Sequence, residues 1–263
     1  MPYRAGGDDA VVGTTVGVTT ALEELKSRGS TLLVVGSVPG SIYAQLSARL
    51  LGEGPDRRRL LVEPRRGPER RLAPVERWTP EWTRVFRCRV AARRSAATAD
   101  ASDAQGEPRP GQWGPDADPA AGPGSGSDAD ADGYGSVVET IDGSIADLGA
   151  AVGDTIRWFD DVAGGLDPAE LRVAFDCVAP LLSAYPDPAI FRFLHLVSFQ
   201  IRRVGGMGHV RLSRPLDSDP VRLLAPLFDA VIQLRLDGTD AVHRWHFRDA
   251  DVVSEWLPVD TTA

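Results

Sequence analysis

The chain has 263 residues, of which 43% are apolar, so it is long enough to bury one large core or two small ones. Its formal net charge is −8, and its two cysteines, Cys88 and Cys177, are too few for a disulfide framework. There is no apolar run of about 18 residues, and the first residues lack the apolar core of a signal peptide, which predicts a cytoplasmic protein that does not associate with membranes.

The basic residues are almost all arginine. The sequence contains 28 arginines but one lysine, Lys26, and its 26 aspartates outnumber its 11 glutamates. This composition is typical of a GC-rich genome and of a salt-adapted archaeal cytoplasm, where an acidic surface stays solvated. It predicts a halophilic protein of haloarchaeal type.

The first elements in chain order predict a strand, a glycine turn and a helix. A helix is expected at residues 20–28, and the apolar run at residues 31–35 is typical of a buried parallel strand. A turn at residues 36–41 then leads into an apolar helix at residues 42–51. This order is that of a phosphate-binding loop.

The chemistry of such a loop is missing. A working loop follows the pattern G-x-x-x-x-G-K-[ST], because the lysine reaches the phosphates and the hydroxyl holds Mg²⁺. Here Gly40 is followed by Ser41 and Ile42 without a lysine, and Pro39 removes one amide. Gly36, Gly40 and Ser41 remain as nucleotide-binding candidates that could offer only the helix dipole and a few amides.

An acidic segment divides the chain. Strands are expected at residues 59–62 and 84–90, and residues 57–94 carry thirteen arginines against four glutamates. Residues 95–136 consist mostly of Ala, Gly, Pro, Ser and Asp, with eight acids and one base, which predicts a disordered insertion. The predicted organisation is one α/β domain in two halves, residues 1–94 and 137–263, with the insertion between them.

The second half begins with a helix and continues with buried strands. Apolar residues at helical spacing from Val137 to Phe159 predict one long amphipathic helix that ends near Asp161. The run from Asp167 to Glu170 predicts a brief turn. The later predicted elements are a strand at 171–175, helices at 178–184 and 189–204, a strand at 209–213, a short helix at 221–228, a hairpin of strands at 230–236 and 242–248, and a last strand at 253–259.

This order of elements resembles the RecA superfamily, nearest to its KaiC-like and gas-vesicle-regulator-like archaeal branch. The matching parts are the strand and turn that end at Ser41, the apolar strand that ends in Asp176, the helix containing Phe191-Arg-Phe-Leu-His-Leu, and the hairpin start Leu-Phe-Asp-Ala-Val-Ile-Gln-Leu-Arg. The resemblance covers roughly residues 20–90 and 137–257. It implies a three-layer α/β fold with a mostly parallel sheet and antiparallel C-terminal strands, in a family that has lost its P-loop signature.

The resemblance also implies two acidic site residues. Asp176 matches the acid that holds Mg²⁺ through water, and Glu63 matches the glutamate that activates the attacking water, so these are the candidate catalytic residues and Asp176 the candidate metal ligand. The residues themselves favour simpler roles. Asp176 can cap the helix at 178–184, and Glu63 can be a surface acid that pairs with Arg65 or Arg66.

The histidines and cysteines predict no further site. His243 and His246 are three residues apart on an expected strand, so they face opposite sides, which disfavours a shared metal. His195 lies in an apolar helix and is expected to be a core or rim residue. Cys88 and Cys177 have no adjacent base for nucleophilic catalysis and are expected in the core.

The arginine-rich segment 57–94 has three interpretations. It can bind nucleic acid, dock an acidic partner, or be neutralised by the chain's own acidic insertion. High salt screens all three, and no nucleic-acid-binding motif is recognisable, which favours the second and third interpretations.

Together these observations predict a non-catalytic regulatory or scaffold protein, a pseudo-ATPase that acts through protein contacts and uses no cofactor. The resemblance also allows a homo-oligomer, because RecA-like domains commonly assemble side by side. The alternatives are a divergent ATPase that binds Mg-ATP with Glu63 and Asp176, and a nucleic-acid-binding transcriptional regulator that uses the arginines of residues 57–94.

Overall fold

The apolar runs of the sequence form the strands of one sheet. The computed structural model describes residues 15–54, 56–64, 79–89, 138–250 and 252–259. The strands are β1 (Ser30–Val35), β2 (Arg58–Pro64), β3 (Thr83–Cys88), β4 (Val138–Ile141), β5 (Leu171–Phe175), β6 (Met207–Leu212), β7 (Ala230–Asp237), β8 (Asp240–Phe247), β9 (Val252–Val253) and β10 (Leu257–Pro258). The helices are α1 (Thr15–Arg28), α2 (Gly40–Leu51), α4 (Ile145–Ala163), α5 (Val178–Ala184), α6 (Asp187–Arg203) and α7 (Asp219–Leu224), with short 3-10 turns η1 (Pro80–Trp82) and η2 (Ala225–Leu227).

The sheet is mostly parallel. Its order is β10-β8-β7-β1-β6-β5-β2-β3-β4, and β9 pairs with β8. The strands from β7 to β4 run parallel, β8 is antiparallel to β7, and β9 and β10 are antiparallel to β8. This confirms the predicted fold class. Strands from both sides of residues 90–137 belong to this one sheet.

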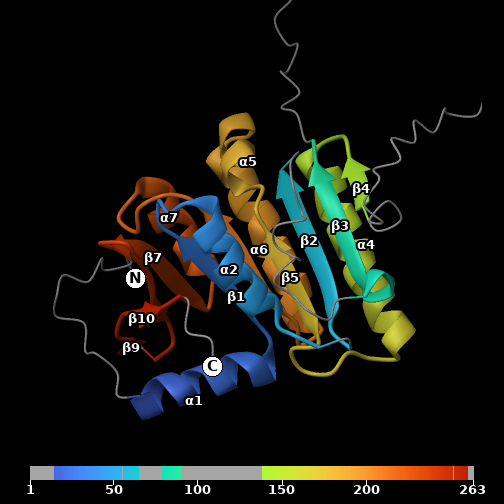
Figure 1. The fold of residues 1–263 in the computed structure, drawn as a ribbon. Helices are drawn as coiled ribbons and strands as arrows, with labels where there is room; N and C mark the ends of the chain where they lie inside the picture. The colour runs from blue at the N-terminus through green and yellow to red at the C-terminus, as the bar shows by residue number, and fades with distance from the viewer. Residues whose placement is uncertain (1–14, 55, 65–78, 90–137, 251, 260–263) are drawn as a thin grey trace, which may run out of the picture.

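Helices cover both faces of the sheet, which makes three layers (Figure 1). Leu33 and Val35 of β1 belong to the core formed with α4, α5, α6 and α7. Leu32 and Val34 belong to the opposite core, formed with α1 and α2. Because both faces of the central strands are covered, the strands are continuous apolar runs rather than alternating ones, as all six residues of β1 are buried.

The long helix expected from Val137 begins later than predicted. Residues Val138–Ile141 form β4, parallel to β3, and α4 starts only at Ile145. Ser144 stops any earlier start, because its side chain accepts a hydrogen bond from the amide of Asp147 and its own amide donates to the Asp147 carboxylate at 2.7 Å. Val137 itself and the predicted insertion at residues 95–136 lie outside the described residues.

The predicted C-terminal hairpin is confirmed. β7 and β8 pair up to Asp237 and Asp240, and Gly238 in the turn has a φ of +63°, which favours glycine. The last predicted strand is shorter than expected. It consists of β9 and β10, which both pair with β8 and leave an irregular segment between them.

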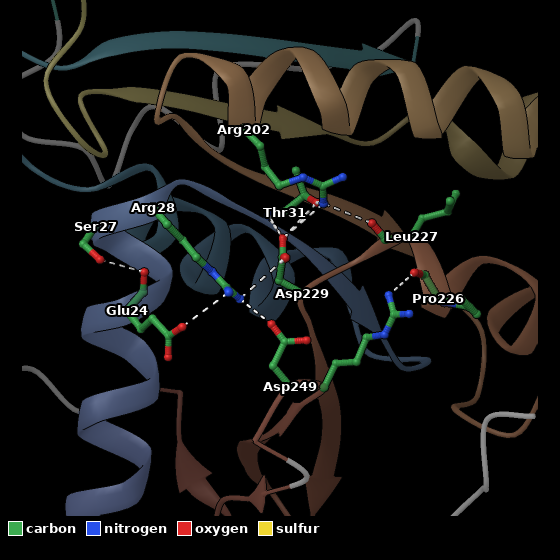
Figure 2. Close-up of polar contacts among 10 residues, drawn as sticks. Glu24, Ser27, Arg28, Thr31, Arg202, Pro226, Leu227, Asp229 and Asp249 are labelled. Atoms are coloured by element: carbon green, nitrogen blue, oxygen red, sulfur yellow. Dashed lines mark hydrogen bonds and ion pairs between the residues drawn. The ribbon is translucent and has the colours of Figure 1, made fainter. Parts of the chain in front are cut away.

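A polar network near the start of β1 joins elements that are far apart in the sequence (Figure 2). Asp229, just before β7, accepts a hydrogen bond from the Thr31 amide at 2.8 Å, and its own amide donates to the Thr31 carbonyl at 2.9 Å. The guanidinium groups of Arg202 and Arg28 lie 3.3 and 3.9 Å from the Asp229 carboxylate. Arg28 also pairs with Asp249 at 2.7 Å. The network therefore ties α1 and α6 to β1 and β7.

We expect Asp229→Ala to lower the free energy of unfolding by about 2–4 kcal/mol, because the Thr31 amide loses its acceptor and the Arg202 guanidinium loses its carboxylate partner. Urea unfolding followed by circular dichroism measures this loss. The control is Asp249→Ala, whose side chain is 62% exposed and should cost less than about 1 kcal/mol. Equal losses for the two variants would contradict a structural role for Asp229.

Candidate functional site

The candidate residues meet at one edge of the sheet. β1, β6, β5 and β2 are parallel, so their carboxyl ends lie together, and this edge is where open α/β sheets commonly bind ligands. Gly36 follows β1, Glu63 lies at the end of β2 and Asp176 follows β5. Because β6 lies between β1 and β5, the glycine turn and Asp176 are two strand spacings apart, about 9.6 Å.

The glycine turn is packed against its neighbours. Gly36 has a φ of +123°, and a Cβ placed there would lie 2.1 Å from the carbonyl oxygen of Leu234 in β7. Its amide donates to the carbonyl of Arg214 at 2.9 Å. Gly36 is therefore explained by a close backbone approach to β7, without a phosphate.

The start of α2 uses its amides within its first turn. The amides of Ile42 and Tyr43 donate to the carbonyl of Pro39 at 3.1 and 3.4 Å. Pro39 occupies the N-cap and makes no side-chain cap, while Gly40 and Ser41 are exposed. The backbone of Gly40 and Ser41 is thus the accessible remainder of the predicted nucleotide-binding turn.

An arginine from the intervening strand lies between α2 and Asp176. The Arg211 guanidinium stacks on the Tyr43 ring, 4.3 Å from its centroid, and Nη1 lies 3.4 Å from Oδ2 of Asp176. Both members of this ion pair are largely buried. The chain therefore supplies its own cation to the carboxylate that the resemblance assigns to Mg²⁺.

A second polar side chain of β6 points to the same helix. Oγ of Ser47 in α2 lies 2.7 Å from Nε2 of His209, and the Tyr43 and His209 rings are 6.3 Å apart. His209 and Arg211 are two residues apart on β6, so they share one face, while Val210 and Leu212 pack into the other core. This alternation of polar and apolar residues along β6 is the signal in the sequence that could have identified His209 and Arg211, neither of which was predicted as a site residue.

Glu63 is not the surface acid that the sequence favoured. Its side chain is 1% exposed, so that interpretation is wrong, and Arg65 and Arg66, its expected partners, lie outside the described residues. The prediction failed because the sequence after β2 is rich in charged residues, a pattern that is typical of an exposed strand end. In the folded sheet β2 lies between β3 and the fully buried β5, so Glu63 is not at an edge strand.

Asp176 does not occupy the position that was predicted for a helix cap. The N-cap of α5 is Cys177, one residue later, and its side chain makes no capping hydrogen bond. The Asp176 carboxylate instead accepts a hydrogen bond from the guanidinium of Arg211. The role that the structure supports for Asp176 is therefore to neutralise that guanidinium.

Cys177 is a core residue, as predicted. Burial raises the pKa of its thiol, a hydrogen bond with Cys88 adds to the effect, and the nearby carboxylates of Asp176 and Glu63 raise it further. The thiol therefore stays protonated and is not a nucleophile. The amide of Asp176 donates to the carbonyl of Val62 at 2.8 Å, so Asp176 and Glu63 lie side by side on one part of the edge.

Arginines near the start of β2 and β5 bind backbone carbonyls. Arg59 is fully buried and donates to two carbonyls in the turn after α2 at 2.7 and 2.9 Å, and Arg172 donates to the carbonyl of Leu50 at 3.2 Å. Arg57 donates to the carbonyl of Ala169 at 2.7 Å. Burial, reinforced by the nearby charge of Arg57, lowers the pKa of both Arg59 and Arg172 to about 10. These arginines hold the end of α2 onto the sheet.

The histidines of β8 face opposite sides of the strand, as predicted. His243 is buried beside the core of α1 and α2, and His246 lies on the other side, 3.3 Å from Oε1 of Gln233. Burial, followed by the charge of Arg49, lowers the pKa of His243 to about 4, and burial, followed by the charge of Arg244, lowers the pKa of His246 to about 4.

His195, expected in the core or at its rim, is exposed on α6. No group of three or more His, Cys, Asp or Glu among the described residues could hold a metal ion.

Comparison with known proteins assigns the chain to a family. Residues 29–234 match the model of a family of unknown function, DUF7504, and the protein belongs to that family. The match spans β1 to most of β7 and so includes the whole carboxyl edge described above. No curated protein matches the chain. Within the described part of the chain, no helix is both long and apolar enough to cross a membrane.

The buried histidines predict a loss of stability in acid. Because both folded pKa values lie near 4 and the unfolded value is near 6.5, the unfolded chain binds more protons between these limits. Stability should therefore fall as the pH drops from about 6.5 to 4, by at most about 1.4 kcal/mol per pH unit for each histidine. Urea unfolding of the wild type and of His243→Gln/His246→Gln at several pH values measures the slope, which the double variant should flatten. His195→Gln removes an exposed histidine as a control, and the same slope in all three proteins would contradict the prediction.

Proposed function

We propose that the protein is a non-catalytic regulatory or scaffold protein, built on a degenerate RecA/KaiC-like fold, that acts through protein–protein contacts. The low cysteine content and the aspartate-rich, lysine-poor composition support a salt-adapted archaeal cytoplasm as its setting. Its family has no assigned function, so the proposal depends on the carboxyl edge of the sheet.

The observation that carries the proposal is the Arg211–Asp176 ion pair. Phosphoryl transfer requires a divalent cation that neutralises the phosphates. The resemblance assigns that cation to Asp176, the acid that follows β5. The guanidinium of Arg211 lies 3.4 Å from that acid and is held against Tyr43. A Mg²⁺ ion at Asp176 would therefore have to approach a site that already has a fixed positive charge, which is unfavourable.

The glycine turn supports the same proposal. The amide of Gly36 is used by the carbonyl of Arg214, and those of Ile42 and Tyr43 are used by Pro39, so these three amides are not available to a phosphate. No lysine follows Gly40. A phosphate that contacted the exposed backbone of Gly40 and Ser41 would be bound weakly. It would lack the lysine ammonium and the Mg²⁺ ion, the two cations on which phosphoryl transfer depends.

A divergent Mg-ATPase is the second candidate, and one observation favours it. Glu63 and Asp176 follow paired residues of β2 and β5, so the two acids lie side by side at the carboxyl edge. The 1% exposure of Glu63 argues against the activation of a water molecule by this residue, because solvent does not reach its carboxylate in this conformation. Catalysis would require the edge to open.

The nucleic-acid candidate is weakened by the contacts of the described arginines. Arg58 pairs with Glu170 and stacks on Trp82, with its guanidinium carbon 4.5 Å from the ring centroid. Arg84 stacks on Trp158 in the same way at 4.6 Å. Like Arg59, these side chains hold the fold together, and the arginines at residues 65–78, 93 and 94 lie outside the described residues.

Mg-ATP titration at molar KCl tests the proposal. We expect no saturable heat in calorimetry and no thermal shift up to millimolar ATP, because the cation site is filled by Arg211. Saturable binding at micromolar ATP would contradict the proposal. In that case Asp176→Ala and Glu63→Gln should abolish binding under the ATPase alternative, while Asp161→Ala, on the exposed side of α4, should not.

A double-mutant cycle tests the ion pair itself. Asp176→Ala should lower the free energy of unfolding by about 1–3 kcal/mol, since it leaves the guanidinium of Arg211 without its carboxylate. The loss in Asp176→Ala/Arg211→Ala should be smaller than the sum of the losses in the two single variants, by a coupling energy of about 1 kcal/mol. Urea unfolding of the wild type and the three variants measures these losses. Strictly additive losses would show that the two residues do not depend on each other.

A further inference from the structure

The outward face of α6 exposes several large apolar side chains. Phe191, Leu196 and Phe199 of α6 and Leu223 of α7 are exposed, and the fractions for Leu196 and Phe199 reach 53% and 55%. The opposite face of α6 is packed in the core through Ile190, Phe193, Leu194, Val197, Ser198 and Ile201. A surface helix of this kind normally has one apolar stripe, so the second stripe requires an explanation.

The exposed residues follow helical spacing. Phe191, His195 and Phe199 are four residues apart, so they form one row along the helix, with Leu196 beside the row. We define the outward face of α6 by its exposed residues Phe191, Arg192, His195, Leu196, Phe199 and Arg203.

A hollow beside this face provides room for a side chain. It has a volume of about 510 Å³ and lies between α6 and α7, lined by Asp187, Pro188, Phe191, Arg192, His195 and Leu223. Its walls thus combine aromatic and aliphatic groups with a few polar ones, as in sites that receive an apolar anchor residue.

The charges of the face are mainly positive. Arg192 and Arg203 are exposed, and neither forms an ion pair with any residue that the structure describes. They are eleven residues apart, which is about 16 Å along the helix. The nearby acids lie at helix starts, where Asp219 already pairs with Arg222 at 3.9 Å and Asp187 lies in the first turn of α6.

We propose that the outward face of α6, together with Leu223, binds an acidic amphipathic helix of a partner protein. Apolar residues of that helix would cover Phe191, Leu196 and Phe199, and carboxylates about three turns apart would meet Arg192 and Arg203. This inference rests on the proposed function, since it names the surface through which the protein makes its contacts.

Two other occupants fit the face less well. A second copy of the chain, packed through the same face, would bring arginines against arginines, which is unfavourable. Single-stranded nucleic acid can stack on phenylalanines beside arginines, but it would leave Leu196 and Leu223 against a polar backbone. Among the described residues, the face offers it only the two arginines as cations.

Selection from a displayed library of 16-residue peptides tests the inference without a known partner. We expect the wild type to enrich peptides with apolar residues four apart and with two or more acids. Synthetic copies should bind at least tenfold more weakly to Phe199→Ser, which removes the most exposed apolar side chain of the face, but equally to the control Leu236→Ser, an exposed apolar residue of β7. Arg192→Glu/Arg203→Glu should also weaken binding tenfold, and peptides with Lys in place of the acids should restore it.

Several outcomes would overturn the inference. These are a failure to enrich any peptide, enriched peptides without acids, and binding that Phe199→Ser leaves unchanged. A dimer in light scattering that Phe199→Ser dissociates would assign the face to a second copy. Binding of a labelled oligothymidylate that Arg192→Glu/Arg203→Glu abolishes would assign it to nucleic acid. Saturable ATP binding would overturn the proposed function alone and would leave a positive peptide result intact.

Discussion

The position of β6 in the sheet is the constraint on which the carboxyl edge depends. β6 lies between β1 and β5 with both faces covered, yet it presents His209 and Arg211 toward α2. A buried polar side chain is costly unless it is paired, so the structure must provide partners. Ser47 meets His209, and Arg211 is shared by the Tyr43 ring and the Asp176 carboxylate. The helix after the glycine turn and the acid after β5 are thereby joined through one strand.

Buried polar side chains are also paired at the amino ends of the parallel strands, near the starts of β2 and β5. Arg59 and Arg172 are buried and donate hydrogen bonds to backbone carbonyls. A guanidinium can serve several carbonyls at once because its donors form a planar fork, whereas a lysine offers a point charge. The lowered pKa values of about 10 remain far above neutral pH, so both groups stay charged. The near absence of lysine is therefore compatible with a fold that uses arginine as a structural residue.

Sequence patterns predicted the fold well where one period dominated. The apolar runs of β1 and β5 and the long apolar face of α4 were identified because covered parallel strands and amphipathic helices have distinct patterns. The predicted start of α4 was wrong because Val137 and Ile141 are four residues apart in the sequence, a spacing that fits one face of a helix as well as one face of a short strand. Glu63 was placed on the surface because its charged neighbours in sequence say nothing about the strands beside it in space. Arg211 was missed because its partners, Tyr43 and Asp176, are distant in sequence.

The carboxyl edge and the outward face of α6 differ in whether their side chains have partners within the chain. At the edge, the chain's own side chains satisfy one another, since Arg211 has its carboxylate and the amide of Gly36 has a carbonyl. On α6, apolar side chains and two arginines are left to solvent, although the other side of the helix is fully packed. Tyr43 and Ser47 approach β6 from the α2 side of the sheet, whereas α6 packs on the other side. A partner could therefore cover α6 without disturbing the Arg211–Asp176 pair, so nucleotide binding and partner binding are physically separate questions in this protein.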